Sequence, residues 1–576
     1  MKVKIAKTAG FCMGVRRAME MVLAEANKGE GPIFTFGPLI HNNQVLDLLA
    51  TKGVSPVEDI QELHDGRIVI RAHGIPPQKR QAIKRTRLKI VDATCPKVAR
   101  VQALIRYHSK KGYTAIIVGD KDHAEIRGLI GYSKMPVHVI QRVEQVAALP
   151  QHEKLFVVAQ TTQNQKNYRI VVKALKERFP EILVFDTICD ATHQRQQEVK
   201  SFSGQVDAVV IVGGYHSGNT QRLCEVSKDA GMPTFHVETE KDLDKQKLRG
   251  MKVIGLTAGA STPNWMIKNV SKEIESIRGR RELSLLRWVK GALKFFVLSN
   301  LAVASGACAF AFAATTLSET KLTLIYPFLT FLYIYAMYAL NRFLDKGASV
   351  YNDPERAIFL KRHKTLLITM GVAAIATALA LALGMGLPTF MALSAFSLLG
   401  IVYSMPLLPQ RIRHKSPYSK IKDIPGSRTL SEALAWAAII GILPLLGTER
   451  IIWPASLLSI LSVFLISYTR SGIFDIFQVQ GDLIVGSETL PITLGEKKTL
   501  VLLKSTIMTS AIILSIAPIL GLVRSFSFLL LLPLFTLSLC LVAYEKSWLY
   551  PGIRLEALVE ANFFLAGFLA VIWQAL

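Results

Sequence analysis

Three passages carry the pattern that decides the fold: KIAKTAGFCMGVRRAMEMVLAEA at 4–26, KIVDATCPKVARVQALIRYHS at 89–109 and ILVFDTICDATHQRQQEVKSF at 182–202. In each, a short apolar run typical of a β-strand ends near a cysteine, and a segment with helical periodicity follows. Cys12, Cys95 and Cys189 therefore occupy the same place in an internal repeat. Three thiols that converge on one centre would make a three-ligand metal or cluster site with one position left open for chemistry.

Length and composition predict two different parts. A chain of 576 residues is too long for one ordinary domain. Near residue 295 a half of mixed charge and short apolar runs gives way to long apolar stretches separated by charged loops. This change predicts a soluble domain joined to a membrane domain.

The formal net charge of +25 does not indicate a nucleic-acid partner, because much of the excess lies in loops between apolar segments and no nucleic-acid-binding motif accompanies it. Six widely spaced cysteines do not form a disulfide pattern. The start MKVKIAKTAG lacks the apolar core of a signal peptide. The first half is therefore expected in a reducing cytoplasm.

Residues 1–277 alternate between strand and helix patterns, which predicts an α/β fold. The expected strands lie near 3–8, 33–36, 67–71, 88–92, 114–118, 154–159, 182–186, 207–212 and 252–256, and the expected helices near 14–27, 97–110, 165–178, 192–203 and 219–230.

Polar residues recur where these strands end. His41, His73 and His123 each follow a strand, and later strands run into VVAQTT, VIVGGYHSGNT and VIGLTAGAST. Ligands of α/β sheets gather outside the carboxyl ends of strands. Imidazole, hydroxyl and amide groups there suit a phosphorylated anion. Glu125, two residues after His123, would serve as a proton relay, although a single histidine or glutamate in such a place is more often structural.

Structural zinc is the main alternative for the three cysteines. It usually takes four ligands with a close C-x₂₋₄-C pair, which this sequence lacks. Cys224, Cys308 and Cys540 do not share the repeated context and are interpreted as small buried hydrophobic residues. The Gly-rich GGYHSG lacks the dinucleotide-binding spacing, so reducing electrons are expected from an external donor.

Nine apolar stretches in the second half approach the length of a membrane span: 295–315, 322–344, 365–384, 388–408, 430–447, 451–469, 500–523, 526–544 and 556–576. With a cytoplasmic N-terminus, the inner loops hold 16 Lys and Arg residues and the outer loops three. This asymmetry predicts nine spans with an external C-terminus. The basic segment 278–294 is interpreted as an interfacial linker on the cytoplasmic leaflet.

Two pairs of polar residues flank the inner ends of these spans. Asn341 and Asp345 are four residues apart on one predicted helix, and Asp475 and Asp482 are seven apart in the loop predicted after the sixth span. Carboxylates at such a place suit magnesium and a diphosphate. The surrounding cations that would neutralise the remaining phosphate charge are Arg428, Arg470, Lys420 and Lys422. The alternative is that these are ordinary loop charges.

Residues 1–277 contain a series of short motifs in this order: GFCMGV, HN at 41–42, RAHG, DATCPKV, DHAE, AQTT, ICDAT, HSGNTQRL and TAGAST. Through these motifs this half of the chain closely resembles the 4-hydroxy-3-methylbut-2-enyl diphosphate reductase (IspH/LytB) family. The resemblance implies a trefoil-like arrangement of three α/β units around a 4Fe-4S cluster.

Carried over by motif, the resemblance implies that Cys12, Cys95 and Cys189 ligate three irons of the cluster. The residues implied to hold the diphosphate are His41, His73, His123, Ser217, Gly218, Asn219 and Ser261. Thr161 and Glu125 are implied to face the substrate hydroxyl, with Glu125 delivering protons. Ala124 stands where the family usually has proline, and Gly218 where it has serine.

The second half contains the motifs NRFLD (341–345), YSMP (403–406) with the basic loop after it, and DIFQVQGDLIVGSETLP (475–491). Through them it resembles the UbiA-type membrane prenyltransferases, over roughly 285–576. The resemblance implies Mg²⁺-assisted prenyl transfer, with Asn341, Asp345, Asp475 and Asp482 binding magnesium and diphosphate. Ser349 and Gln478 stand where the family often has acids.

Together these patterns predict a bifunctional isoprenoid enzyme of the cytoplasmic (inner) membrane. A reductase domain at 1–277 would face the cytoplasm and take electrons from a ferredoxin- or flavodoxin-type donor. A linker at 278–294 would join it to a multi-pass prenyltransferase domain at 295–576 that acts on prenyl diphosphates and an unidentified acceptor. The alternatives are a redox sensor in the first half, and a degenerate anchor or a transporter in the second.

Overall fold

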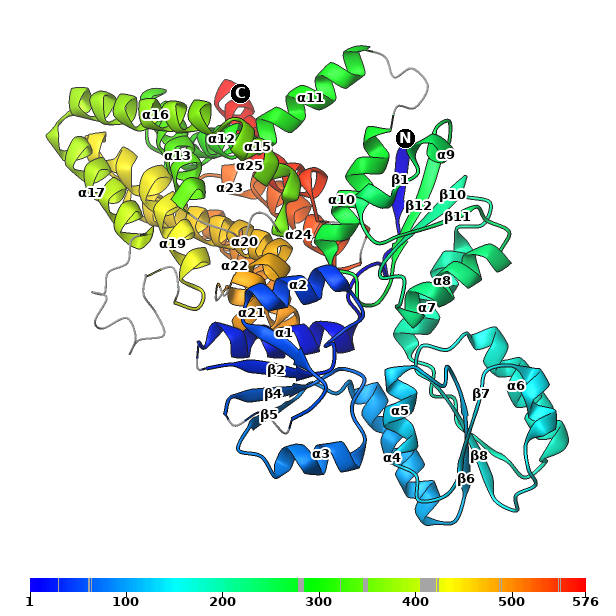
Figure 1. Cartoon of the computed structure of the whole chain (residues 1–576). Helices are drawn as coiled ribbons and strands as arrows, with labels where there is room; N and C mark the ends of the chain where they lie inside the picture. Colours follow the sequence, from blue (N-terminus) through cyan, green and yellow to red (C-terminus); the bar gives the residue numbers. More distant parts are fainter. Residues whose placement is uncertain are drawn as a thin grey trace. The chain divides into compact units, whose positions relative to one another are not determined.

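The computed structural model describes the chain except residues 30, 61–62, 64, 278–283, 322, 345–350, 405–420, 422–423, 486, 488, 547 and 550. The chain forms two compact units, Met1–Arg281 and Glu282–Leu576 (Figure 1). The first unit is α/β, and the described residues of the second are helical, so the predicted fold class is confirmed. The expected linker spans the boundary, and its residues 278–283 lie outside the described part of the chain.

The described residues of the first unit form three four-stranded sheets in which every neighbouring pair is parallel. In spatial order the sheets are β3 (Val54–Val57), β2 (Ile33–Phe36), β4 (Arg67–Ile70), β5 (Lys89–Asp92); β7 (Val137–Ile140), β6 (Thr114–Val118), β8 (Leu155–Ala159), β9 (Leu183–Val184); and β11 (Thr234–Val237), β10 (Ala208–Val212), β12 (Val253–Ala258), β1 (Lys2–Ile5).

The three sheets repeat one topology, and the third is completed by the first strand of the chain. In each sheet the second strand in repeat order forms one edge and pairs with the first strand. The third strand pairs with the other side of the first strand, and the fourth strand forms the opposite edge. β1 pairs with β12 and takes the fourth place in the last sheet. The central strands β6, β8 and β10 are buried along their whole length, as expected for parallel strands covered on both faces.

Helices connect these strands, and three of them begin at the predicted cysteines: α1 (Met13–Asn27), α4 (Pro96–Lys110) and α7 (Asp190–Ser201). The other helices and single turns are α2 (Asn43–Thr51), α3 (Pro77–Lys84), α5 (Ala124–Ile130), η1 (Val143–Ala148), α6 (Gln165–Arg178), α8 (Gly218–Asp229), η2 (Glu240–Asp242), α9 (Lys245–Leu248) and α10 (Asn264–Ser276).

Three strands, β3, β7 and β11, are absent from the sequence prediction. Each lies at the edge of its sheet, where one side needs no strand partner. Such strands tolerate Pro56, His138 and His236, which weaken the apolar pattern.

The second unit is a bundle of long helices around an apolar core. Its helices are α11 (Ser284–Leu298), α12 (Leu301–Leu317), α13 (Ile325–Leu344), α15 (Pro354–Arg362), α16 (Lys364–Met385), α17 (Leu387–Ser404), α19 (Ser427–Trp436, continued by η4 Ala437–Ile442 and η5 Leu443–Gly447), α20 (Trp453–Val485), α21 (Leu490–Leu494), α22 (Glu496–Ile519), α23 (Phe526–Leu529), α24 (Leu531–Glu545) and α25 (Ile553–Ala575).

Within the described residues, six helical stretches have the length and apolar character to cross a membrane, and the bent pair α11–α12 would add a seventh. α13 and α17 occupy the second and fourth of the nine expected spans. Large apolar side chains face outward from the bundle, among them Leu383, Met391, Leu398, Val501, Met508 and Phe568. A surface of this kind is stable only against lipid, so the protein is a multi-pass membrane protein.

Two boundaries in the second unit differ from the prediction. The first span does not run from 295, because Asn300 adopts a left-handed conformation (φ 68°) between α11 and α12 and the axis bends there by 75°. The predicted loop after residue 469 is instead helix up to Val485. Asp475 and Asp482 therefore lie on a helix.

Candidate functional site

The three cysteines have the same local geometry. Each is the N-cap residue of its helix, and each backbone N–H donates to a carbonyl two residues beyond the end of a strand in its sheet. The bonds run from Cys12 to Ala260 (3.1 Å), from Cys95 to Ala72 (2.9 Å) and from Cys189 to Thr161 (2.9 Å). The repeat seen in the sequence is thus a repeat in space.

The Cys95 thiol lies near the thiols of both Cys12 and Cys189. Burial raises the pKa of the Cys95 thiol, and the charges of Cys12 and Cys189 raise it further. A Cβ on Gly14, in the first turn of α1, would come within 2.6 Å of the Cys95 sulfur. Lys97, two residues after Cys95, forms an ion pair of 2.6 Å with Asp190, the residue after Cys189. All six cysteines lie in the described part of the chain and none is in a disulfide.

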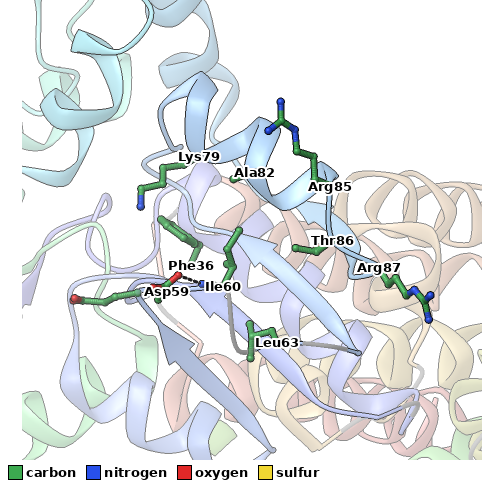
Figure 2. Close-up of a pocket in the computed structure, with 10 residues that line it drawn as sticks. Phe36, Asp59, Ile60, Leu63, Lys79, Ala82, Arg85, Thr86 and Arg87 are labelled. Carbon is green, nitrogen blue, oxygen red and sulfur yellow. Dashed lines mark hydrogen bonds between the residues drawn. The ribbon is translucent and has the colours of Figure 1, made fainter.

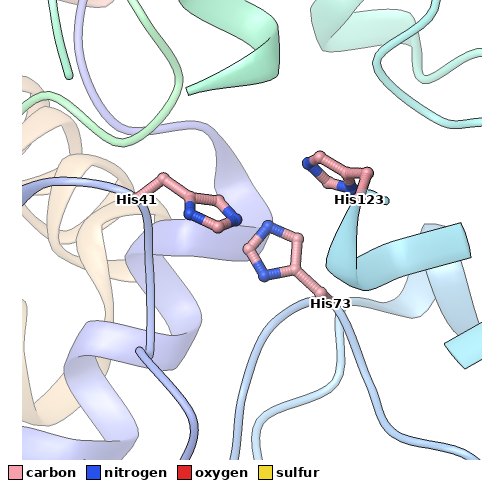
Figure 3. A group of neighbouring side chains, drawn as sticks. All are labelled: His41, His73 and His123. Carbon is pink, nitrogen blue, oxygen red and sulfur yellow. The ribbon is translucent and has the colours of Figure 1, made fainter. Parts of the chain in front are cut away.

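His41, His73 and His123 form a cluster, as Figure 3 shows. Their ring centroids are 4.8, 5.5 and 5.4 Å apart. Burial lowers the pKa of His41 and holds the pKa of His73 well below its usual value, and it lowers the pKa of His123 to about 4. Near neutral pH the three rings are therefore uncharged, and each can donate one N–H.

Several buried polar atoms around this cluster have no hydrogen-bond partner among the described residues. They are His41 Nε2, His73 Nδ1 and Asn219 Nδ2. Buried polar groups are rarely left unpaired in proteins. The cluster is therefore shaped for a polar ligand that supplies the missing partners.

Residues of the third sheet approach the same cluster. Ser217 is the N-cap residue of α8, and a Cβ on the next residue, Gly218, would lie 3.6 Å from the His123 ring. Ser261 Oγ donates to the carbonyl of His41 over 3.2 Å. Ser217, Asn219 and Ser261 are all buried. The structure thus brings the polar strand ends of all three sheets together.

Glu125 connects the histidine side of the site to the cysteine side. Its carboxylate is 1% exposed and accepts two bonds of 2.8 Å from Thr161, one from the backbone N–H and one from the hydroxyl. Burial raises the pKa of Glu125, although the bonds from Thr161 act in the opposite direction. The Thr161 carbonyl accepts the N–H of Cys189. A buried acid thus lies next to both groups of residues.

Arg71 belongs to this site and has no predicted role in the sequence reading. Its charge lowers the pKa of all three clustered histidines. Gly37 (φ 68°) makes room for it, because a Cβ there would lie 2.6 Å from Arg71 Nη1. The available signal is a charged residue directly after the buried strand β4, in IVIRAHG.

We expect the first unit to lose stability as the pH falls from 6.5 towards 4. The unfolded chain protonates His123 near pH 6.5, whereas the folded chain does so only at about 4, so acid favours the state that binds more protons. His123 alone would contribute on the order of 3 kcal/mol over this window. The raised pKa of Glu125 works the other way, but the lowered values of His41 and His73 add to the effect.

Hydrogen–deuterium exchange of peptides from 1–277 measures this loss in the full-length protein. His123→Asn should make the pH dependence shallower. Equal protection of wild-type peptides at pH 7 and pH 4 would contradict the expectation.

A separate pocket of about 560 Å³ lies beside α3 and is shown in Figure 2. Its walls combine apolar side chains with charges of both signs: Phe36, Glu58, Asp59, Ile60, Leu63, Lys79, Ala82, Arg85, Thr86 and Arg87. It shares no residue with the histidine cluster, and no predicted site residue lines it. Because acidic and basic side chains are mixed in its walls, the pocket does not indicate a particular class of ligand.

In the second unit, Asp475 and Asp482 lie on one face of α20. They are 1% and 0% exposed, and Arg428 approaches both, at 3.7 and 3.4 Å. Thr429 Oγ donates to Asp475 over 2.5 Å. Asn352 Nδ2 donates to Asp482 over 3.1 Å and its Oδ1 accepts the N–H of Gly481. Asn352 is not among the residues predicted from the sequence. The only feature of the sequence that points to it is its position shortly after the NRFLD motif.

The other predicted residues of this site have different outcomes. Asn341 lies in the last turn of α13, half-buried. Asp345, Lys420 and Lys422 lie outside the described residues. The guanidinium of Arg470 is bound to Glu432 and Glu560 in the interior. These contacts do not support its predicted role in neutralising phosphate.

Comparison with known proteins agrees with this division of the chain. Residues 3–275 match the model of the family described as LytB protein, and residues 302–567 match that of the UbiA prenyltransferase family. A 4-hydroxy-3-methylbut-2-enyl diphosphate reductase of Geotalea daltonii is 45% identical over 277 residues, which are 48% of this chain and 98% of the relative.

Two solved structures are also similar. One is a structure of (E)-4-hydroxy-3-methyl-but-2-enyl diphosphate reductase, with 38% identity and a TM-score of 0.39, which covers 48% of this chain and 100% of its own. The other is an apo structure of a UbiA homolog from Aeropyrum pernix K1, with 14% identity and a TM-score of 0.37 over 47% of this chain and 98% of its own. Through its first half the chain belongs to the LytB family of 4-hydroxy-3-methylbut-2-enyl diphosphate reductases, and its second half is a domain of the UbiA prenyltransferase family.

Proposed function

We propose that residues 1–277 reduce 4-hydroxy-3-methylbut-2-enyl diphosphate to isopentenyl and dimethylallyl diphosphate. The observation that carries this proposal is the position of Glu125. It is buried and bonded twice to Thr161, whose carbonyl accepts the N–H of Cys189, and its own backbone N–H donates to His123 of the neutral histidine cluster. Consumption of the allylic diphosphate by purified protein with reduced methyl viologen tests it.

Cys12, Cys95 and Cys189 would hold a 4Fe-4S cluster. The donor set fits, because the three free thiols stand at the N-caps of three helices, the Cys95 thiol lies near the other two, and soft sulfur ligands suit iron–sulfur clusters. Gly14 leaves the space that the Cys95 sulfur occupies. When bound, such a cluster supplies electrons and, at an iron without a protein ligand, a Lewis-acid position for the substrate hydroxyl.

The diphosphate would bind where the polar strand ends meet. His41, His73 and His123 are uncharged and would donate N–H groups to it. The side-chain amide of Asn219, whose Nδ2 has no partner among the described residues, would be a further donor. Ser217, Gly218 and Ser261 complete the set, with the N-terminus of α8 favouring negative charge. The buried charge of Arg71 adds attraction for an anion.

Glu125 would deliver the proton with which the allylic hydroxyl leaves as water. Its raised pKa keeps the carboxyl protonated to higher pH than an exposed glutamate, as a general acid requires. Thr161 fixes its orientation through two bonds. Two electrons per turnover would come from a ferredoxin- or flavodoxin-type donor, and a second proton would be taken up at an allylic carbon, where the new C–H bond of the product forms.

Glu125→Gln should lower the turnover rate of the reductase by about 100-fold or more, because general acid catalysis typically contributes 10²–10⁴-fold. Glutamine keeps the size of the side chain and can still accept from Thr161, so cluster colour and diphosphate binding should persist. Pre-steady-state reduction and calorimetric binding of the substrate measure the two effects. An E125Q protein that turns over at the wild-type rate would remove Glu125 from the mechanism.

We further propose that residues 295–576 transfer a prenyl group from its diphosphate to an acceptor. Asn341, Asp345, Asp475 and Asp482 would hold Mg²⁺ and the diphosphate. Two fully buried carboxylates on one helix face support this, since buried acids in a membrane helix are costly and usually functional. Arg428, which approaches both, would contact phosphate oxygens.

The alternative for this domain is a degenerate anchor that leaves only the reductase active. An anchor has no use for the Asp475–Asp482–Arg428 arrangement, whereas a transferase does. A membrane assay with labelled prenyl diphosphates and a panel of quinone, heme and sugar precursors separates the two, because an anchor would label none of them.

We infer that the protein lies in the cytoplasmic membrane with its reductase domain in the cytoplasm. The excess of Lys and Arg in the predicted inner loops supports this orientation. The segment 278–294 would be the linker at the inner leaflet. Accessibility of cysteines placed at the exposed Lys247 and at the C-terminus to an impermeant reagent in intact cells tests the orientation.

A further inference from the structure

Arg470 lies at the centre of a polar cluster inside the helical unit. It is 4% exposed, and its guanidinium donates to Glu560 on α25 (Nε to Oε1, 3.1 Å) and to Glu432 on α19 (2.6 Å). It also donates to the Tyr338 hydroxyl on α13 over 2.9 Å, and Ser471 donates to the second oxygen of Glu432 over 2.7 Å. Four helices thus meet through one cation.

Glu560 has an oxygen that this network does not use. The Glu560 residue is only 5% exposed, and its Oε2 atom has no hydrogen-bond partner among the described residues. Water at the surface therefore does not supply the missing partner. Leaving a buried acceptor unpaired costs about 1–3 kcal/mol, and more when it is charged. Two carboxylates share one guanidinium here, so the cluster holds more acid than an ion pair needs. An unpaired acceptor is a place where a ligand's O–H or N–H group can bind.

The cluster lies directly beyond the proposed diphosphate site. Contacts between α19 and α20 form successive steps: Arg428 with Gln478 and Asp482, Thr429 with Asp475, and Glu432 with Arg470 and Ser471. Arg470 is five residues before Asp475, about 7–8 Å along the helix. On α13, Tyr338 is three residues before Asn341 and so shares its face. On both α13 and α20, the cluster therefore lies about one helical turn from the residues of the proposed diphosphate site, on the side away from the predicted cytoplasmic end of α13.

We propose that Glu560 is the base that takes up the proton released by the acceptor during prenyl transfer, a role that rests on the proposed transferase activity of this domain. In that reaction the bond between the prenyl C1 carbon and the diphosphate oxygen breaks, and the diphosphate leaves with the electron pair. The acceptor's nucleophilic atom forms a bond to C1, and its proton passes to the Glu560 carboxylate. Arg470, which is itself bound to Glu432, holds that carboxylate in place.

The same contacts define the acceptor class. Arg470 already faces two carboxylates and has no spare positive charge for an anionic acceptor. Its guanidinium also lies over the rings of Trp436 and Phe474, at 5.1 and 4.7 Å from their centroids. A neutral molecule with an O–H group, or an electron-rich ring, fits an apolar wall with one unpaired acceptor oxygen. A carboxylate-bearing acceptor would meet repulsion.

The test uses Glu560→Gln in the full-length protein reconstituted in liposomes. Glutamine can still accept from Arg470 but cannot take up a proton. With Mg²⁺ and geranyl diphosphate carrying ¹⁸O at the bridging position, we expect wild-type rates of label scrambling into non-bridging oxygens, because scrambling reports only breaking and re-forming of the C1–O bond. Transfer to neutral acceptors should fall by about 100-fold or more.

Two further measurements separate a base from a structural residue. Formate, as a small carboxylate, should restore part of the transfer activity to Glu560→Gly. In acceptor pairs that differ by a carboxylate, wild-type protein should prefer the neutral member. Glu545→Gln, which alters an exposed partner of Lys504, is the matched control and should behave as wild type.

Wild-type transfer rates in E560Q would overturn the proposal, and so would loss of scrambling together with transfer, which would mark the cluster as structural. A distinct result is wild-type protein that neither scrambles the label nor transfers a prenyl group to any acceptor. That outcome would overturn the transferase activity itself, and the base with it.

Discussion

Cys95→Ser should give a colourless protein without reductase activity that still transfers prenyl groups. Serine is nearly the size of cysteine, so it fits beside Gly14 at the N-cap position of α4. Its hydroxyl is a poor ligand for iron, which leaves two thiols where three are needed. The visible absorbance, the iron content and the consumption of substrate with reduced methyl viologen should all fall to background.

Cys224→Ser is the matched control for this variant. Cys224 is buried in the apolar core of the third sheet and does not cap a helix, so its replacement should leave colour and reduction in place. A coloured, fully active Cys95→Ser protein would contradict the cluster assignment. Wild-type protein that is brown but does not consume the allylic diphosphate would instead indicate a redox sensor.

Asp475→Asn should abolish prenyl transfer and leave reduction unchanged. Asparagine keeps the shape of the side chain and can accept from Thr429, but it removes a charge that Mg²⁺ requires. Loss of a residue that only supports metal ligands costs about 10–100-fold, so loss of a ligand should cost at least about 100-fold. Transfer from labelled geranyl diphosphate, measured across a Mg²⁺ titration, checks this.

The control for Asp475→Asn is Glu449→Gln, which changes an exposed acid in the connection between α19 and α20. It should leave both activities unchanged. If D475N transfers prenyl groups at the wild-type rate and with the same Mg²⁺ dependence, the acids on α20 are not the metal site.

The cysteine and histidine positions were predictable because each follows a strand with a clear apolar pattern. Cys95, for example, stands three residues after the end of β5, and His73 three after β4. At such places the chain must leave the sheet, so local sequence is enough to locate the residue. The direct bond between Glu125 and Thr161, in contrast, joins residues 36 positions apart and depends on how β6 and β8 pair.

The closure of the third sheet could not be predicted from local pattern. β1 pairs with β12, so Lys2 lies opposite Val253. The strand pattern of residues 2–5 is compatible with any sheet in the unit. Only the repeat as a whole, which requires a fourth strand beside β12, selects this partner.

In the membrane half, hydropathy predicts the wrong end for one helix, because charged residues are buried there beside partners from other helices. Hydropathy predicts a span and then a loop where the structure has one helix of 33 residues, α20, because Arg470, Asp475 and Asp482 interrupt its apolar run. In the folded protein Arg470 is paired with Glu560, and Asp475 and Asp482 are both approached by Arg428, all from other parts of the chain. Single-sequence hydropathy cannot register such partners, since they are distant in the chain.

The central claim is that one chain carries two consecutive kinds of isoprenoid chemistry. The most direct measurement divides one preparation of the protein, reconstituted in liposomes, between two assays. One uses labelled 4-hydroxy-3-methylbut-2-enyl diphosphate with reduced methyl viologen, and the other labelled geranyl diphosphate with Mg²⁺ and the acceptor panel. We predict labelled isopentenyl and dimethylallyl diphosphate in the first and a labelled prenylated acceptor in the second. Reduction without labelling of any acceptor would contradict the claim and leave the second domain as an anchor.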